Sequence, residues 1–92
     1  MIQMEITTED REKAITYLMT TLPDDTIQKV SQKIHEEGEG YLMELHHGFG
    51  TQVRNLLRKG GFHWGAIVLD NEWDSLVLEA VKRKLQRLKN NP

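Results

Sequence analysis

The hydrophobic residues of this 92-residue chain recur at intervals of three and four, which is the spacing of amphipathic helices. The first such pattern predicts a helix over residues 8–21, with Thr7 and Asp10 in a capping arrangement at its start. Pro23 breaks the pattern and suits the first turn of a second helix, which carries a narrow apolar stripe. The glycines of "HEEGEG", residues 35–40, predict the end of that second helix.

The most regular pattern lies in the third segment and predicts a helix from Tyr41 to Lys59. Its apolar positions are Leu42, Leu45, Phe49, Val53 and Leu56. Gly60 and Gly61 form a strong stop signal after it. The stretch "HHGFGTQVRN", residues 46–55, is therefore predicted to lie inside a helix, although each helical glycine costs about 1 kcal/mol relative to alanine.

The last segment begins ambiguously. "FHWGAIVL", residues 62–69, is either a short helix or a buried extended segment, because no second strand is available to pair with it. Asp70, Asn71 and Asp74 are the candidate N-caps of a long final helix with a wide apolar face. Together these elements predict one all-α domain over residues 1–92, a compact bundle of four to five short helices with an optional short extended segment near 62–69.

Composition limits the size and surroundings of any site. A chain of this length buries a modest core, and a hydrophobic fraction of 38% is low for a free-standing globule, so we expect a homodimer. The absence of cysteine removes disulfides and thiolate zinc sites and fits a cytoplasmic protein. The first ten residues lack the features of a signal peptide, and the longest aliphatic run, "AIVL", is far too short to cross a membrane.

The stretch "HHGFGTQVRN" carries the first candidate site. On a helix, Gly50 shares one side with His46, His47 and Arg54, so that side presents two imidazoles, a gap without a side chain and a guanidinium. One interpretation is a notch in which Arg54 clamps a phosphate, a carboxylate or the backbone of a ligand. The other is close packing against a second helix, with Arg54 and Asn55 bonding to its ends. Both hold together if that second helix belongs to another subunit.

Metal and catalytic chemistry have less support. Side chains at the adjacent positions 46 and 47 diverge by about 100° on a helix and do not readily chelate one ion. The chain contains no nucleophile motif, phosphate-binding glycine loop or dinucleotide fingerprint. We therefore expect no metal and no cofactor and lean against an enzyme. A small hydrolase or anion-ligand-binding protein centred on His47 and Arg54 is kept as an alternative.

A further alternative is nucleic-acid binding through the last helix, where positive charge gathers. Residues 1–45 carry ten acidic and four basic side chains, whereas residues 46–92 carry four acidic and eight basic ones. The basic cluster consists of Lys82, Arg83, Lys84 and Arg87. Charge complementarity between the two halves of one fold is the competing explanation. The isoelectric point of about 6.1 lies below that of a dedicated nucleic-acid binder.

Residues 45–57, "LHHGFGTQVRNLL", resemble the H-x-G-x-G-x-x-x-R-N signature of a family of small bacterial and phage-borne proteins classed as a domain of unknown function. The matching residues are His46, Gly48, Gly50, Arg54 and Asn55. A later Gly-Ile-x-His-Pro-Asp-Asp segment of that family is echoed by Asp70, Asp74 and Ser75, without its proline. The resemblance implies no activity, but it implies that His46, Arg54 and Asn55 form a unit.

These observations lead to one functional prediction. We expect a small regulatory or inhibitory module without enzymatic activity that binds another macromolecule, first of all a protein. The predicted binding surface comprises His46, His47, Gly50, Arg54 and Asn55. Nucleic acid is a less favoured partner, and no membrane association is expected.

Overall fold

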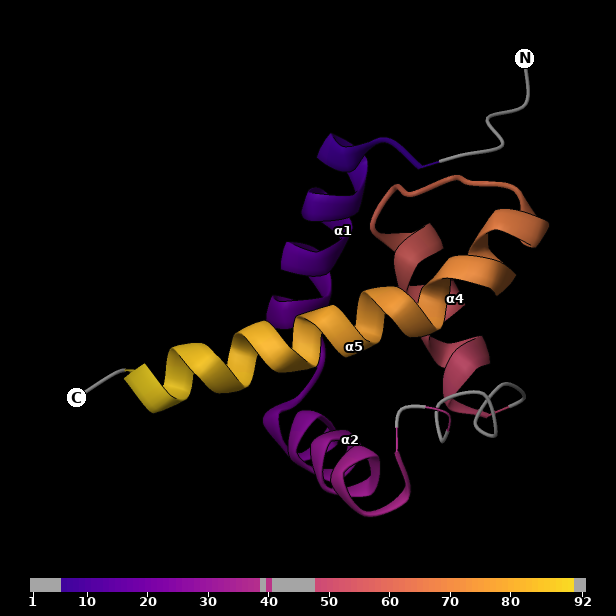
Figure 1. The fold of residues 1–92 in the computed structure, drawn as a ribbon. Helices are drawn as coiled ribbons and strands as arrows, with labels where there is room; N and C mark the ends of the chain where they lie inside the picture. The colour runs from indigo at the N-terminus through magenta and orange to yellow at the C-terminus, as the bar shows by residue number, and fades with distance from the viewer. Residues whose placement is uncertain (1–5, 39, 41–47, 91–92) are drawn as a thin grey trace.

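The longest helix of the protein is the element on which the others pack. The computed structural model describes residues 6–38, 40 and 48–90, apart from the side chains of residues 88 and 90. This part of the chain forms four helices and no strand: α1 (Thr8–Thr21), α2 (Asp24–Glu37), α4 (Phe49–Lys59) and α5 (Ala66–Asn90). In Figure 1, α5 runs across the molecule with α1 above it, α2 below it and α4 behind it, and each of the three packs against α5. The all-α prediction is confirmed.

Local sequence signals set the bounds of α1 as predicted. Thr7 has an extended backbone, and its hydroxyl oxygen accepts a hydrogen bond of 3.1 Å from the backbone N–H of Asp10. This bond satisfies one of the donors that the first turn of a helix leaves without a partner. The buried face of α1 carries Ala14, Ile15, Leu18 and Met19.

Helix α2 follows almost at once. Pro23 is the extended residue immediately before the helix, where its missing N–H costs nothing. At the other end, Gly38 adopts a φ of 89° and donates its N–H to the carbonyl of Ile34 at 2.8 Å. A positive φ is a conformation that glycine adopts without strain, so the predicted stop in "HEEGEG" is confirmed.

The start of α4 differs from the prediction. The helix begins at Phe49, and Gly48 before it has φ −98° and ψ −84°, which is not helical. The helix predicted from Tyr41 therefore does not run through Gly48, and "HHGFGTQVRN" spans a helix start and not a helix middle. Glycine has a low helix propensity, and here that outweighs the apolar period. Residues 41–47 lie outside the described part of the chain.

The start of α5 also differs from the prediction. Residues 62–65 are not helical, and α5 begins at Ala66, so the predicted N-caps at Asp70, Asn71 and Asp74 are wrong. The N–H of Leu69 donates to the carbonyl of Gly65 at 3.0 Å, which makes "AIVL" the first turn of the helix. Leu69 is fully buried, and its burial on the core-facing side stabilises this early start.

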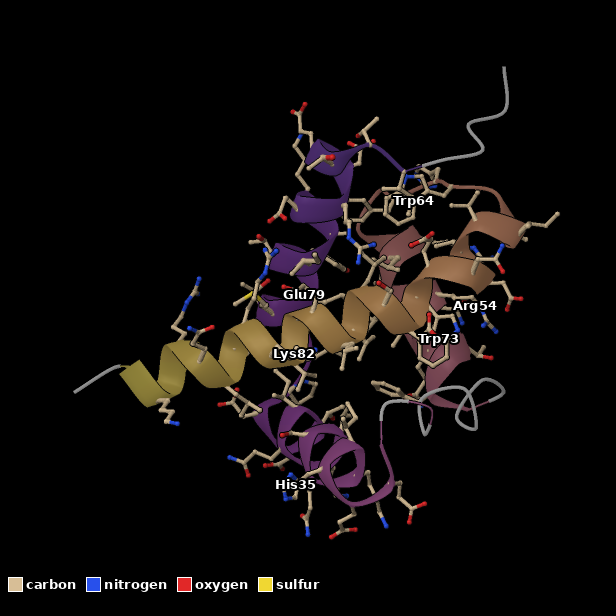
Figure 2. All side chains as sticks on the ribbon, viewed as in Figure 1. His35, Arg54, Trp64, Trp73, Glu79 and Lys82 are labelled. Atoms are coloured by element: carbon tan, nitrogen blue, oxygen red, sulfur yellow. The ribbon has the colours of Figure 1, made fainter. Side chains whose placement is uncertain are left out.

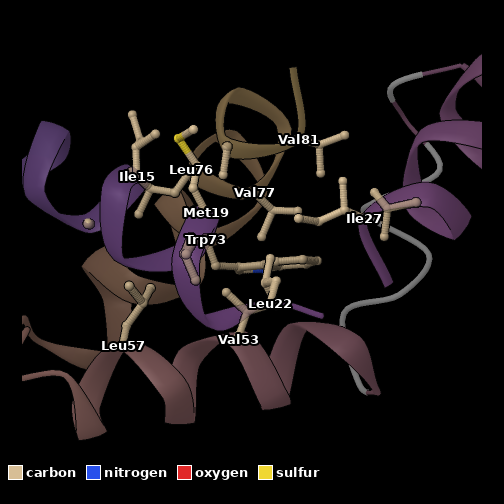
Figure 3. Packing of buried hydrophobic residues seen from close by; sticks show 14 of the residues in the cluster. Ile15, Met19, Leu22, Ile27, Val53, Leu57, Trp73, Leu76, Val77 and Val81 are labelled. Carbon is tan, nitrogen blue, oxygen red and sulfur yellow. The ribbon is translucent and has the colours of Figure 1, made fainter. Parts of the chain in front are cut away.

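The core gathers where α1, α2 and α4 meet α5. Trp73 of α5 is 2% exposed and lies within this cluster, with Val53 and Leu57 of α4 on one side of it in Figure 3. Trp64, just before α5, is also buried and lies 5.3 Å from Phe62, measured between ring centroids. Both tryptophans therefore serve packing, as aromatic side chains of this size most often do.

Candidate functional site

Gly50 lies against a tryptophan. A β-carbon built on Gly50 would lie 2.8 Å from Cζ2 and 3.0 Å from Cε2 of Trp73. Gly50 is itself buried. The gap that the sequence predicted at this position is real, but the side chain of Trp73 fills it. Of the two interpretations, close helix packing within one chain describes Gly50.

Arg54 bonds to the helix that supplies this tryptophan. Its Nη1 lies 3.3 Å from Oδ1 of Asp70 in the second turn of α5, and its Nη2 donates to the hydroxyl of Thr51 at 3.1 Å. The Arg54 side chain is only 15% exposed, whereas that of Asp70 is 49% exposed. In Figure 2, Arg54 lies beside the first turns of α5. The guanidinium thus ties α4 to α5 at the place where Trp73 meets Gly50.

Asn55, the other described polar residue of the predicted site, does not join Arg54 in its contact with α5. Asn55 is exposed and accepts a hydrogen bond of 3.2 Å from Nη1 of Arg58, one turn further along α4. His46 and His47 lie outside the described residues, so the binding role predicted for these residues stays a prediction. The structure joins Gly50 and Arg54 to α5 and leaves Asn55 on the outer surface.

The basic cluster of α5 is partly engaged in the fold. Arg83 donates to both carboxylate oxygens of Glu12 on α1, at 2.5 and 2.9 Å, and its Nε donates to Glu79 at 3.0 Å. These bonds raise the pKa of Arg83 and lower the pKa of Glu12. The hydrogen bond from Arg83 is the largest cause of the lowered pKa of Glu12. Nζ of Lys84 lies 3.9 Å from Asp24 of α2. Arg83 therefore links helices, which supports the charge-complementarity explanation for this residue.

A groove lies between α2 and the first turn of α4. It encloses about 450 Å³, and its apolar lining consists of the half-buried Phe49 and, at its base, the buried Val30. Phe49 is held from behind, because its ring meets that of Trp73 edge to face at a centroid distance of 6.2 Å. The polar lining residues are Thr26, Lys29, Gln32, Lys33 and Glu36.

The sequence alone missed this groove for a simple reason. Lys29 and Lys33 occur one turn apart on the predicted second helix, beside the apolar stripe that contains Val30. The sequence therefore shows one wall of the groove. The other wall, Phe49, belongs to a different helix. Only the packing of Phe49 against Trp73 brings it beside α2.

A second, smaller depression runs along the outer face of α4. It encloses about 390 Å³ and is lined by Gln52, Asn55, Leu56 and Lys59. These residues follow the helical spacing of three and four, so they form one strip on the helix. Among the described residues of the predicted site, Asn55 alone lines this depression.

The described residues form neither a metal site nor a membrane span. No three histidine, aspartate or glutamate side chains in that part of the chain lie close enough together to hold a metal ion. None of its helices combines the length and the hydropathy needed to cross a membrane.

Comparisons with known proteins add no relative. No protein family, no curated protein and no solved structure matches this chain. The resemblance of residues 45–57 to the bacterial and phage-borne family therefore stays a prediction, and function is argued from the surface itself.

Proposed function

We propose that this protein is a small non-enzymatic interaction module that binds an amphipathic, acidic helix of a protein partner in the groove between α2 and α4. The observation that carries the proposal is the composition of that groove. The half-buried ring of Phe49 offers an apolar surface with the buried Val30 at its base, and Lys29 and Lys33 stand beside it on successive turns of α2. Its cysteine-free sequence fits the cytoplasmic location that we propose for it.

An amphipathic helix suits a groove of this kind. Such a helix lays apolar side chains spaced by three and four residues into a groove between two helices. Phe49 is a suitable anchor point, because its ring is half-buried and packs edge to face on Trp73. Lysine side chains at the edge add contact through their aliphatic stems and attract acidic residues through their charge.

The charges of the groove also favour one orientation of the partner. Lys33 lies 3.9 Å from Glu36, which neutralises part of its charge. Lys29 has no ion-pair partner among the described residues, and it is exposed. The acidic residues of the partner are therefore expected near Lys29, with neutral or basic residues near Glu36.

A selection from a library tests this proposal. The library consists of helical peptides with apolar residues at every third and fourth position and random charges between them. Peptides that bind the purified protein are enriched from it. We expect enriched sequences to be acidic, and their amide shift changes in the ¹⁵N-labelled protein to centre on Val30, Lys33 and Phe49. Recovery of no binder, or of binders without acidic residues, would contradict the proposal.

Charge reversal locates the binding surface. Lys29→Glu should lower the affinity for the selected acidic peptide about tenfold, since a charge that repels the peptide replaces one that attracts it at the edge of the groove. Lys59→Glu on the outer face of α4 is the matched control and should leave affinity unchanged. Arg54→Ala tests the site predicted from the sequence, and a loss of binding in that variant alone would move the binding surface to α4.

A further inference from the structure

The outward side of α5 is left without a neighbour by the three other described helices. Helix α1 contacts one flank, where Arg11 bonds to Glu72 at 3.3 Å and to Ser75 at 2.5 Å. Helices α2 and α4 approach from the opposite flank, through the contacts Lys84–Asp24 and Asp70–Arg54. Figure 1 shows α1 above α5, α2 below it and α4 behind it, so these helices do not cover the side of α5 that faces the viewer.

This outward side carries a stripe that is symmetric about Leu78. Residues four positions away in each direction are Asp74 and Lys82, and residues seven positions away are Asn71 and Leu85. At about 100° per residue, these steps keep all five side chains within roughly 40° of Leu78 around the helix axis. Leu78 and Leu85 are half-buried, because they also pack against the edge of the core, and Asp74 is partly exposed. Asn71 and Lys82 are exposed.

We infer that a second copy of this chain covers the outward side of α5, with the two α5 helices antiparallel and Leu78 on the two-fold axis. In that arrangement residue 78 faces its own copy, and Asp74 faces Lys82 of the partner subunit. A two-fold axis repeats every contact, so the dimer contains two such Asp–Lys pairs, one on each side of a Leu–Leu contact.

The charges select this arrangement over others. A parallel pair in register would place Asp74 beside Asp74 and Lys82 beside Lys82, which is unfavourable twice. The antiparallel pair turns the same four charges into two attractive contacts. A stripe with Leu78 at its centre and one acid and one base placed evenly on either side is thus complementary to itself in charge, which is what a symmetric dimer requires. Leu85 then faces Asn71 of the partner subunit.

The apolar content of the stripe sets the strength of the dimer. Leu78 and Leu85 are its leucines, and Ile67 near the start of α5 is 78% exposed and lies on the same side. This apolar area is small for a permanent dimer, because obligate interfaces are larger and more hydrophobic. We therefore expect a reversible dimer whose population rises with protein concentration.

Sedimentation velocity of the full chain over a range of concentrations tests the inference. Wild type should shift from monomer to dimer as concentration increases, and Leu78→Asp should raise the dissociation constant at least about a hundredfold, since a charge at the axis meets its own copy. A wild-type protein that stays monomeric at every concentration overturns the inference.

Exchange of the two charges gives the sharper test. Asp74→Lys and Lys82→Asp should each raise the dissociation constant about tenfold, because each creates two repulsive contacts. The double variant Asp74→Lys/Lys82→Asp restores opposite charges and should return to within about twofold of wild type. A double variant as weak as the single ones would overturn the antiparallel register.

Two controls separate dimerisation from folding and from partner binding. Asp25→Lys on the exposed start of α2 makes the same charge change away from α5 and should not alter the dissociation constant. Thermal unfolding followed by circular dichroism identifies any variant that fails to fold. The groove between α2 and α4 contains no residue of this stripe, so peptide binding and dimerisation can fail independently.

Discussion

The indole of Trp73 occupies the space that a side chain on Gly50 would need. Three carbons of the six-membered ring lie 2.8–3.3 Å from the position of a β-carbon on Gly50. Real β-carbons essentially never approach a neighbour within 3.0 Å, so glycine at position 50 is a condition for this packing. The Gly50–Trp73 contact thereby fixes how closely α4 approaches α5.

Gly50→Ala should therefore lower the free energy of unfolding, although alanine is the better helix former. The propensity gain is at most about 1 kcal/mol. Overpacking a filled core costs about 1–3 kcal/mol, and Trp73, which is 2% exposed, has no open space into which to move. We expect a net loss of about 1 kcal/mol by urea denaturation.

A double-mutant cycle with Trp73→Phe checks the cause. Phenylalanine lacks the far ring carbons that crowd position 50, so Gly50→Ala should cost less in that background, or even stabilise the protein. An equal cost in both backgrounds would assign the effect to the helix start and not to the tryptophan.

At Gly61, the backbone conformation alone should determine the stability cost of a substitution. Its φ is 95°, and a β-carbon there would meet nothing within 4 Å. Gly61→Ala should destabilise the protein by about 1 kcal/mol through backbone strain alone. Gly61→Asn should cost less, because asparagine tolerates a positive φ better than alanine does. Equal losses for the two variants would exclude this explanation.

The Glu12–Arg83 pair predicts a pH dependence of stability. Hydrogen bonds from Arg83 hold the pKa of Glu12 below its ordinary value in the folded state. A lowered folded-state pKa stabilises the fold above the ordinary pKa, and the contribution disappears as pH falls and Glu12 takes up its proton. The difference in Tm between wild type and Glu12→Gln should therefore be largest near neutral pH and shrink in acid. A Tm difference that stays constant across the pH range would contradict the role given to the Glu12–Arg83 pair.

Arg54 and Asp70 should show a small but measurable coupling. The Arg54 side chain is mostly buried, whereas Asp70 is half exposed, so solvent screens the pair. We expect a coupling of about 0.5 kcal/mol in a cycle of Arg54→Ala and Asp70→Ala, measured by urea denaturation. Added salt should reduce it. A coupling that is absent at low salt would mean that this contact does not connect α4 to α5 in solution.

The first half of the fold could be read from the sequence because its helix ends depend on neighbouring residues. The hydroxyl of Thr7, the ring of Pro23 and the positive φ of Gly38 each act within four residues of the boundary that they set. Such signals are local, and the predicted bounds of α1 match the structure.

The second half could not be read in the same way because contacts between helices decide its boundaries. The spacing of apolar residues continues across Gly48. That spacing gives no information on backbone dihedral angles, so the sequence did not predict that α4 starts after Gly48. Asp70 looked like a cap, but it serves as the partner of Arg54 inside α5. The predicted face around Gly50 likewise had two interpretations until Trp73 was located.

The position of α5 at the end of the element order affects how the protein is made. The contacts of α1 with α5 join residues far apart in sequence, by 61 positions for Arg11–Glu72 and 71 for Glu12–Arg83. The ribosome therefore releases α1, α2 and α4 before the helix on which all three pack. Until α5 emerges, Ile15 and Leu18 of α1 have no core to enter, and the nascent chain presents them to chaperones and to other unfinished copies.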